Sequence, residues 1–232
     1  FQNGINLEIV GELVSKPYVE MTLKLMKEFG IESDWTNNII TINHQKYIPK
    51  DYTVEADWSA ASFWFEIASL SKRCNIRLNG LQQNSIQGDK RSIEIFNNLG
   101  VDSIFENEKL ILTKNQTISP FQTYNLIETP DLYQPLRCTF FSKNIKADFS
   151  GIQTLKDKET DRIISVETEL NKLNSIKIID THNDHRMAMS FAPLCLEFGK
   201  LQINDVEVVS KSYPDFWEDL KKAGFTISLL SD

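Results

Sequence analysis

An internal repeat restricts the fold of this chain more than any other feature of its sequence. Three times, a segment that ends in an acidic residue is followed by an apolar helix-like run and then by a strand of alternating apolar residues. The helix-like runs are Ser59–Ser71, Leu132–Phe141 and Arg186–Phe198. Because the alternation has a period of two, each strand should bury one face. The sequence therefore predicts an α/β (α+β) protein built from repeated helix–strand units.

Each unit has a second half, an amphipathic helix and a short strand. We expect these helices to end at Gly or Asn, which favour the left-handed conformation that closes a helix. The predicted ends are Phe29-Gly30-Ile31, Leu99-Gly100-Val101, Leu173-Asn174-Ser175 and Ala223-Gly224-Phe225. The predicted strands are Ile39–Ile42, Lys109–Thr113, Ile176–Ile179 and Thr226–Leu230. Residues 5–42, with a strand at 5–10, match only the end of a fourth copy, so we expect further sequence upstream of Phe1.

Composition narrows the class of protein. The 232 residues are 41% hydrophobic and 25% charged, enough for one large or two modest cores. A net charge of -7 argues against a nucleic-acid partner, which would need a basic face. No apolar run approaches the roughly 18 residues of a membrane span, and no secretory signal pattern opens the chain. The scattered Cys74, Cys138 and Cys195 favour reduced core thiols in a cytoplasmic protein.

The densest group of ionisable side chains is Asp184-His185-Arg186, directly before the apolar segment Met187–Leu196. Polar residues at the start of an apolar helix suit an anion site or a proton-transfer site, where the helix adds N–H groups and partial positive charge. A simple capped helix start would have the same sequence. His182 and His185 have a spacing that a metal could use, but zinc would want a third ligand, and the other histidine is the distant His44. We expect no metal.

A second cluster, Lys158-Glu159-Thr160-Asp161-Arg162, lies at another predicted helix start. On a helix, Lys158 and Arg162 would share a face, where two cations can hold a phosphate or a carboxylate. A carboxyl beside them, that of Glu159, could donate or accept a proton. The alternative is a solvated, charged helix start.

Three further segments carry single candidates. Pro130-Asp131-Leu132 places a carboxylate at a helix start. Asp131 could be catalytic, or it could simply be an N-cap without a catalytic role. Ser15-Lys16-Pro17-Tyr18 could present a hydroxyl and a helix N-terminus to an anion, or simply start a helix with Pro at its first turn. Lys211 lies in a predicted loop before the last helix. Helix starts and post-strand loops line one end of each unit, so we expect these residues to converge in one cleft.

Taken together, these motifs resemble the EPSP synthase (3-phosphoshikimate 1-carboxyvinyltransferase) family. The segments that resemble it, in the family's order, are Ser15-Lys16-Pro17-Tyr18, Val54-Glu55-Ala56-Asp57 with Ser59-Ala60-Ala61, Asn84-Ser85-Ile86-Gln87-Gly88-Asp89, Pro130-Asp131, Lys158-Glu159-Thr160-Asp161-Arg162, Asn183-Asp184-His185-Arg186-Met187-Ala188-Met189 and Lys211-Ser212-Tyr213-Pro214-Asp215. The fifth and sixth of these together are highly specific. The resemblance covers the C-terminal half, or slightly more, of the family's chain.

The resemblance implies two similar domains of three repeated units each, with the active site in the cleft between them. Residues 1–53 would be the last part of the first domain, and residues 54–232 the second domain, of the enolpyruvyl-transferase type. The implied reaction moves the enolpyruvyl group of phosphoenolpyruvate to the 5-hydroxyl of shikimate 3-phosphate, releasing phosphate, in the shikimate pathway of aromatic amino-acid biosynthesis. It implies a cytoplasmic enzyme, monomeric when complete, without a metal or organic cofactor. We expect this chain alone, with about half of the site, to be inactive.

The resemblance also assigns roles to residues. Asp131 resembles the base that takes the 5-hydroxyl proton, and Glu159 the acid that protonates the methylene carbon of phosphoenolpyruvate. Arg162, Arg186 and Lys211 resemble the phosphoenolpyruvate clamp, whereas Ser15, Tyr18 and Lys158 resemble shikimate 3-phosphate ligands. The substrate-binding set also includes Asp184 and Thr154, and Thr154 stands where the family often has Asn or His.

Two other functions fit parts of the pattern. The sister enolpyruvyl transferase that acts on UDP-N-acetylglucosamine shares the architecture, but the Lys-Glu-Thr-Asp-Arg and Asn-Asp-His-Arg-Met motifs favour the shikimate enzyme. A non-catalytic repeat protein that binds anionic ligands would have charged loops without this ordered set of motifs.

Overall fold

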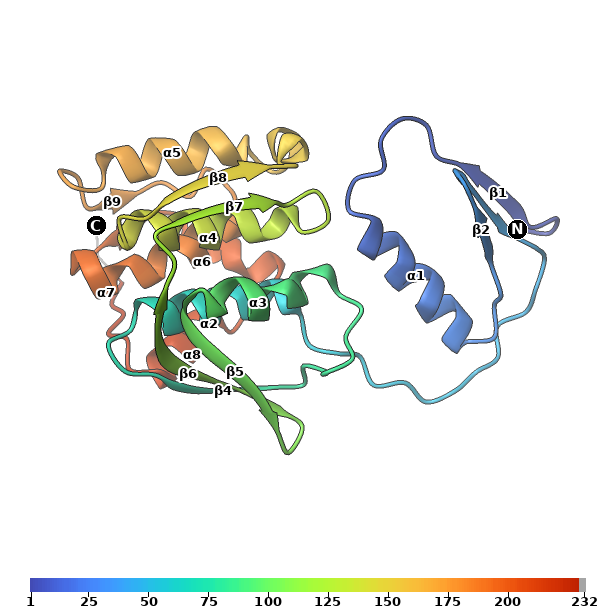
Figure 1. The fold of residues 1–232 in the computed structure, drawn as a ribbon, viewed down its shortest axis with the longest axis horizontal. Helices are drawn as coiled ribbons and strands as arrows, with labels where there is room; N and C mark the ends of the chain where they lie inside the picture. Colours follow the sequence, from blue (N-terminus) through green and yellow to red (C-terminus); the bar gives the residue numbers. More distant parts are fainter. Residues whose placement is uncertain (230–232) are drawn as a thin grey trace.

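The computed structural model describes residues 1–229. Figure 1 shows two parts, one formed by helix α1 with the first strands and the other by all later elements. Residues 43–57, which have no regular secondary structure, connect the two parts. The boundary predicted between residues 53 and 54 falls within this connection, and the assignment of the two parts to domains of a longer protein stays a prediction.

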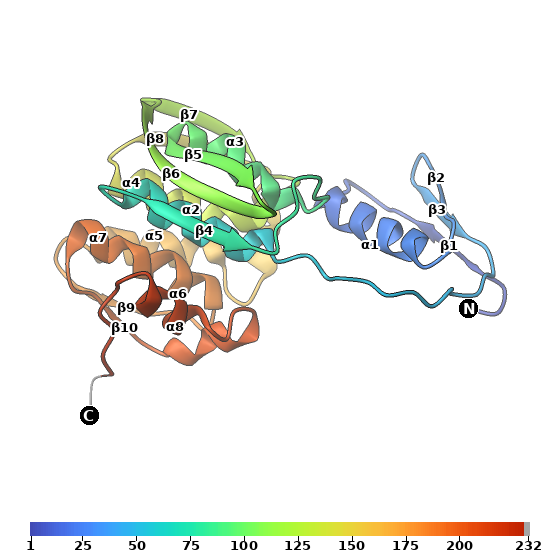
Figure 2. The same cartoon turned by 90° about the horizontal axis from the view of Figure 1, so that it is seen from below.

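The smaller part is an antiparallel sheet with one helix beside it (Figure 2). The strands β1 (Ile5–Glu8), β2 (Asp34–Thr36) and β3 (Ile39–Ile42) lie in the order β1-β3-β2. Helix α1 (Lys16–Glu28) begins with Pro17 in its first turn, as predicted, because its fixed φ suits a helix start. None of its residues is buried. Within residues 1–229, tertiary packing therefore adds little to the stability of α1.

Three helices form the centre of the larger part. They are α2 (Trp58–Leu70), α4 (Tyr133–Ser142) and α6 (His185–Phe191), the first helices of the three repeated units, and they pack against one another. Helix α2 is buried over nearly its whole length, with the side chains of Phe63 and Phe65 fully enclosed. An apolar helix of this kind must lie inside a core. The apolar helices of the three repeated units thus pack together in one core.

Strands and further helices surround this core. An antiparallel sheet has the order β4-β6-β5, whereas β7 pairs with β8, and β9 with β10, in parallel. The strands are β4 (Asn75–Asn79), β5 (Leu99–Glu106), β6 (Lys109–Ile118), β7 (Phe121–Asn125), β8 (Lys146–Ser150), β9 (Ile178–Ile179) and β10 (Gln202–Ile203). The remaining helices are α3 (Ser92–Asn97), α5 (Arg162–Lys172), α7 (Cys195–Phe198) and α8 (Phe216–Lys222). Short 3-10 turns are η1 (Gly88–Arg91), η2 (Pro130–Leu132), η3 (Gln153–Asp157), η4 (Ala192–Leu194) and η5 (Val206–Lys211).

The mixed helix-and-strand class is confirmed, but several predicted element ends are wrong. Leu99-Gly100-Val101 opens β5 instead of closing a helix, and the pairing of β5 with β6 shifts there, with Gly100 at φ 92°. A bulge of this kind uses the freedom of glycine at positive φ. Pro193 interrupts the third apolar helix at η4, because proline cannot donate the helical hydrogen bond. Residues 226–229 form no strand, and Leu230 lies outside the described residues.

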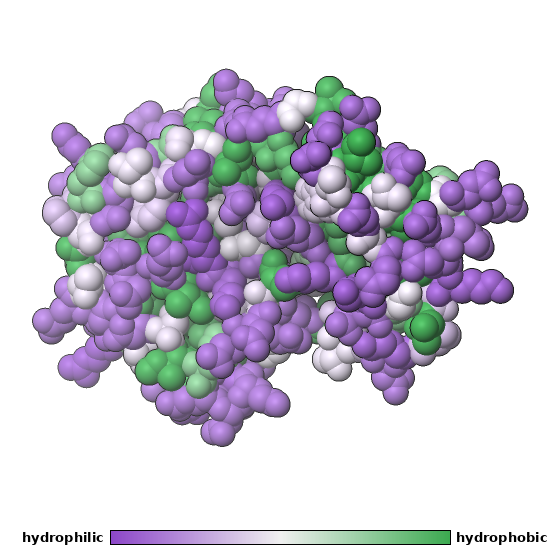
Figure 3. Space-filling model, turned by 45° about the vertical axis from the view of Figure 1, so that its right-hand side comes forward, coloured by the Kyte–Doolittle hydropathy of each residue, from purple (hydrophilic) through white to green (hydrophobic). Residues whose placement is uncertain are grey.

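The surface that Figure 3 displays is mostly hydrophilic, with apolar residues scattered between charged ones. Throughout residues 1–229, every helix is too short or too polar to cross a membrane.

One buried side chain breaks the apolar pattern of the core. Glu66, in the middle of α2, is fully buried, and neither of its carboxylate oxygens has a hydrogen-bond partner within residues 1–229. Burial raises the pKa of Glu66 well above its ordinary value, because a charge without a partner is costly in a low-dielectric interior. The folded chain therefore keeps a proton on Glu66 at pH values where the unfolded chain has lost it.

We predict that Glu66→Gln stabilises the chain increasingly as pH rises above the ordinary glutamate pKa. The wild-type protein loses stability over that range, by about 1.4 kcal/mol per pH unit until the pKa of the folded state is reached. The variant has no proton to lose. Thermal melts at pH 4 and pH 7 would measure the difference, with the exposed Glu94→Gln as the control. The interpretation is wrong if Glu66→Gln and wild type show the same pH dependence.

Candidate active site

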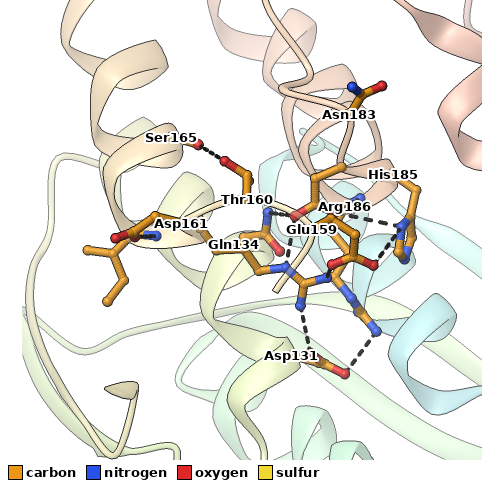
Figure 4. A network of polar contacts seen from close by, with 12 residues as sticks. Asp131, Gln134, Glu159, Thr160, Asp161, Ser165, Asn183, His185 and Arg186 are labelled. Carbon is orange, nitrogen blue, oxygen red and sulfur yellow. Dashed lines mark hydrogen bonds and ion pairs between the residues drawn. The ribbon is translucent and has the colours of Figure 1, made fainter. Parts of the chain in front are cut away.

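Three segments that follow strands bring the two charged clusters together. Asp131 lies in η2, after β7. Arg162 is the first residue of α5, after β8, and Glu159 lies three residues before it. Asp184 and Arg186 lie at the start of α6, after β9. Figure 4 shows the side chains of Asp131, Glu159 and Arg186 gathered in one place. The predicted convergence of Asp131 with both clusters is confirmed within the larger part of the chain.

Arg162 is the centre of this group. Its side chain is 2% exposed, and each of its three nitrogens meets a different carboxylate. Nη1 lies 2.8 Å from Asp131 Oδ1, Nη2 lies 2.7 Å from Glu159 Oε2, and Nε lies 2.8 Å from Asp184 Oδ2. Only a guanidinium can donate in these three directions from one rigid plane. Arg162 therefore fixes three carboxylates from three segments.

Arg186 has a different environment. Its Nη2 lies 3.0 Å from Asp131 Oδ2, which is the one hydrogen bond of its side chain within residues 1–229. Burial alone would lower the pKa of Arg186, but Asp131 and the more distant Asp89 and Tyr18 raise it overall. Arg186 is thus a firmly charged group with donors left over. It is better suited than Arg162 to bind an added anion.

Asp131 is ionised because of these two arginines. Burial would raise its pKa, but Arg186, Arg162 and Lys158 together lower it. The N-cap role considered for Asp131 is wrong, because within residues 1–229 its carboxylate caps no backbone N–H and faces the guanidinium groups instead. An ionised carboxylate held at the edge of a buried cluster can accept a proton from a hydroxyl.

Glu159 is the most exposed carboxylate of the cluster, with 32% of its side chain accessible. Its partial burial raises its pKa, but its own backbone N–H and then Arg162, His185 and Arg186 lower it overall. Glu159 is therefore ionised at rest. It can act as an acid only after another anion has raised its proton affinity.

Asp184 holds the two arginines in place. It is fully buried; its Oδ1 caps α6 by accepting from the Arg186 N–H at 2.9 Å, and its Oδ2 accepts from Arg162 and from Gln134 Nε2 at 3.2 Å. The predicted helix cap is confirmed. The sequence did not single out Gln134, although it follows Asp131 by three residues and so lies about one helical turn further on.

A strained turn precedes this cap. His182 and Asn183 both adopt left-handed φ values, 49° and 60°, which are unfavourable for residues other than glycine. The buried Glu169 holds the turn, with Oε1 2.9 Å from His182 Nε2. The turn directs the Asn183 carbonyl to Lys211 Nζ at 3.1 Å. Glu169, which sequence reasoning missed, thereby links Lys211 to the cluster.

The other predicted residues lie around this group. Lys158 is exposed and precedes α5, so the expectation that it shares a helix face with Arg162 is wrong. Its charge nevertheless acts on Asp131. Thr154 lies in η3, in the segment between β8 and α5 that also carries Lys158. Ser15 and Tyr18, at the start of α1, come from the smaller part of the chain, and the Tyr18 phenol is close enough to Asp131 for that charge to raise its pKa.

Glu159, Asp184 and His185 place ligand atoms within 4.8 Å of one another, as a metal site would. Both carboxylates already bind Arg162, whose positive charge would oppose a cation. His182, half of the histidine pair weighed from the sequence, is turned instead to Glu169. This donor set does not fit a metal.

Comparison with known structures assigns this fold to a class. In overall structure the chain resembles enolpyruvyl transferases: an EPSP synthase from Acinetobacter baumannii at a TM-score of 0.75 and 18% identity, covering 98% of this chain and 58% of that one, and the enolpyruvyl transferase NikO from Streptomyces tendae at 0.59 and 14%, covering 96% and 56%. At such identities the likeness concerns the fold alone.

The sequence defines the family. Residues 1–220 match the profile of EPSP synthase (3-phosphoshikimate 1-carboxyvinyltransferase), and the chain belongs to that family. It is 42% identical to the 3-phosphoshikimate 1-carboxyvinyltransferase of Bacteroides fragilis (strain YCH46), over 98% of this chain and 61% of the relative. For the enzyme of that name from Methanospirillum hungatei JF-1, the identity is 31%, over 95% and 56%. The chain thus spans about 60% of the length of the curated relatives that it matches.

We predict that Arg162→Lys destabilises the folded chain by about 3–5 kcal/mol, because an ammonium replaces one of three contacts and leaves buried carboxylates unpaired. Urea unfolding of the 232-residue chain would measure the loss. Arg137→Lys is the matched control, since its partner Glu167 is 36% exposed and can be solvated. Equal, small losses in the two variants would show that Arg162 does not organise the cluster.

Proposed function

We propose that the complete protein transfers the enolpyruvyl group of phosphoenolpyruvate to the 5-hydroxyl of shikimate 3-phosphate, with release of phosphate, in the shikimate pathway of aromatic amino-acid biosynthesis. Membership of the EPSP synthase family supports this proposal. The structural observation that carries it is the ionised Asp131, held between Arg162 and Arg186 at the edge of a buried cluster. Such an arrangement sets a general base beside cations that bind anionic substrates.

In the proposed first step, Asp131 takes the proton of the 5-hydroxyl while that oxygen forms a bond to carbon 2 of phosphoenolpyruvate. Glu159 gives a proton to carbon 3, which becomes a methyl group, and a tetrahedral intermediate results. In the second step the methyl group returns a proton to the Glu159 carboxylate, the double bond re-forms, and the bond from carbon 2 to the phosphate oxygen breaks. The proton held by Asp131 leaves with the released phosphate. Positioned acid and base groups of this kind contribute about 10²–10⁴-fold each to rate.

Because Glu159 is ionised at rest, the proposal requires proton uptake when phosphoenolpyruvate binds. The negative charge of the substrate would neutralise the arginines that now lower the pKa of Glu159. The substrate would thus create its own acid. This makes protonation of Glu159 dependent on occupation of the site.

We assign Arg186 and Lys211 to the phosphoenolpyruvate anion. Arg186 has donors available, and Lys211 Nζ contacts the Asn183 carbonyl in the turn that precedes Arg186. Arg162 remains in the clamp, but its three carboxylate contacts favour a positioning role. Ser15, Tyr18, Lys158 and Thr154 are assigned to shikimate 3-phosphate. Asp184 is assigned to the site as the residue that orients both arginines. The three unpaired cysteines are in keeping with a cytoplasmic enzyme.

The substrate is tested with the protein at its full natural length. We predict phosphate release from phosphoenolpyruvate at about 1 per second or faster when shikimate 3-phosphate is added, and no release above background with UDP-N-acetylglucosamine. Release with the nucleotide sugar alone would assign the sister activity. Binding of both anions without any release would favour a non-catalytic protein.

We predict that Asp131→Asn and Glu159→Gln both lower kcat by about 10²–10⁴-fold while substrate dissociation constants change little. Only Glu159→Gln should slow the incorporation of solvent deuterium into the methyl group of the intermediate, measured by rapid quench. Glu167→Gln, a change outside the cluster, is the control. Wild-type deuterium incorporation in Glu159→Gln would exclude Glu159 as the acid.

A further inference from the structure

A second buried carboxylate lies near the cluster, on an element to which no role has been assigned. Asp89, in η1, is 1% exposed. Its Oδ2 accepts a hydrogen bond from the Ser59 hydroxyl at 2.5 Å, and its Oδ1 has no partner within residues 1–229. A buried polar atom that is left unpaired usually has a functional or conformational reason.

Ser59 connects Asp89 with the smaller part of the chain. The Ser59 side chain also lies near the Tyr18 phenol of α1, close enough to act on the pKa of that phenol. Burial raises the pKa of Tyr18, as do the charges of Asp89 and Asp131, while Ser59 and Arg186 lower it. Tyr18 thus lies between Ser59 on one side and the charge of Asp131 on the other.

Two further contacts bring the start of α1 against the segment that leads to Asp131. The Ser15 backbone N–H donates to the Ile127 carbonyl at 2.9 Å. Beside it, a methyl group added at Gly88 would lie 3.0 Å from the Glu128 carbonyl oxygen and 3.3 Å from the Pro17 side chain. Residue 88 therefore has to be small for the two parts to approach this closely.

We propose that Asp89 is a positioning residue that, through the Ser59 hydroxyl, holds Tyr18 and the start of α1 against the segment carrying Asp131. For the reaction, this means that Asp89 sets the shikimate 3-phosphate side of the site without touching the substrate. That consequence rests on the proposed function. The docking of α1 does not.

The charge state of Asp89 provides a specific signature. Burial raises its pKa to about 7, and Asp131 and Asp57 add to the rise, whereas Ser59 and Arg186 lower it. Tyr18 is the facing titratable group from α1. An anionic ligand nearby raises the pKa of Asp89 further, so binding takes up a proton above pH 7. Affinity for the anion should then fall as pH rises above about 7, by at most tenfold per pH unit.

Asp89→Asn keeps the shape and the acceptor for Ser59 but cannot ionise, whereas Asp89→Ala loses both. The exposed Asp148→Asn is the matched control. In the protein at its full natural length, calorimetry with shikimate 3-phosphate at pH 6.5 should give wild-type affinity for Asp89→Asn and about fivefold weaker binding for Asp89→Ala, the equivalent of one hydrogen bond. Between pH 6.5 and pH 8.5, wild type and Asp148→Asn should weaken more than Asp89→Asn. Equal pH dependence in all three would overturn the assignment.

Amide hydrogen exchange at Ser15, in the 232-residue chain without ligand, tests the positioning independently of the reaction. Exchange should be about fivefold faster in Asp89→Ala and in Ser59→Ala, and unchanged in Asp89→Asn and Asp148→Asn. Unchanged exchange in both of the first two variants would overturn the inference, whatever the activity. If the exchange rates change as expected but the protein does not bind shikimate 3-phosphate, the proposed function is overturned and the docking role of Asp89 is supported.

Discussion

The candidate site depends on one buried guanidinium. Arg162 donates to Asp131, Glu159 and Asp184, and these come from three segments of the chain. None of the three carboxylates could be held so near the others without a cation between them, because like charges in a low-dielectric interior repel strongly. The position of each follows from the plane of Arg162. The first residue of α5 therefore determines the geometry of elements that lie far from it in sequence.

The balance of charge in this group bears on its chemistry. Arg162 and Arg186 face three carboxylates, and all three nitrogens of Arg162 are paired, whereas Arg186 keeps donors for an added anion. In the proposed function, an anionic substrate would bind Arg186, and proton uptake by Glu159 would relieve the excess of negative charge. Substrate binding and acid activation would then be one linked event. Preorganised charge of this kind lowers a barrier without reorganisation during the reaction.

The cluster is rigid on one side and open to adjustment on the other. Asp184 and the strained turn at His182 and Asn183 are fixed by buried partners, above all Glu169. The start of α1 reaches the site through few contacts, and α1 itself buries none of its residues. A weakly packed element at the edge of a site is suited to move. Asp89 and Ser59 lie near Tyr18 of α1, so a movement of α1 would change their surroundings.

Local sequence determined the repeated units and the helix starts. Apolar periodicity placed α2, α4 and α6, and the capping pattern around Asp184 identified the start of α6, because both signals arise from neighbours within a turn of the chain. Motif order was also sufficient to identify the family. The ends of α3 and of the third apolar helix were wrong, since a bulge at Gly100 and the break at Pro193 depend on strand pairing and on local hydrogen bonding.

Only the tertiary structure decided what the polar residues do. Sequence could name Asp131 and Arg162, but not that two arginines rather than a helix end keep Asp131 ionised. It gave no reason to choose Gln134 or Glu169, and it placed Asp89 in a family-like motif without a role. The partners of these residues are up to 50 residues away along the chain. Burial and long-range charge act through space, and they are set only when separate repeats pack together. The local sequence therefore identified candidate residues, whereas the fold decided their ionisation and their partners.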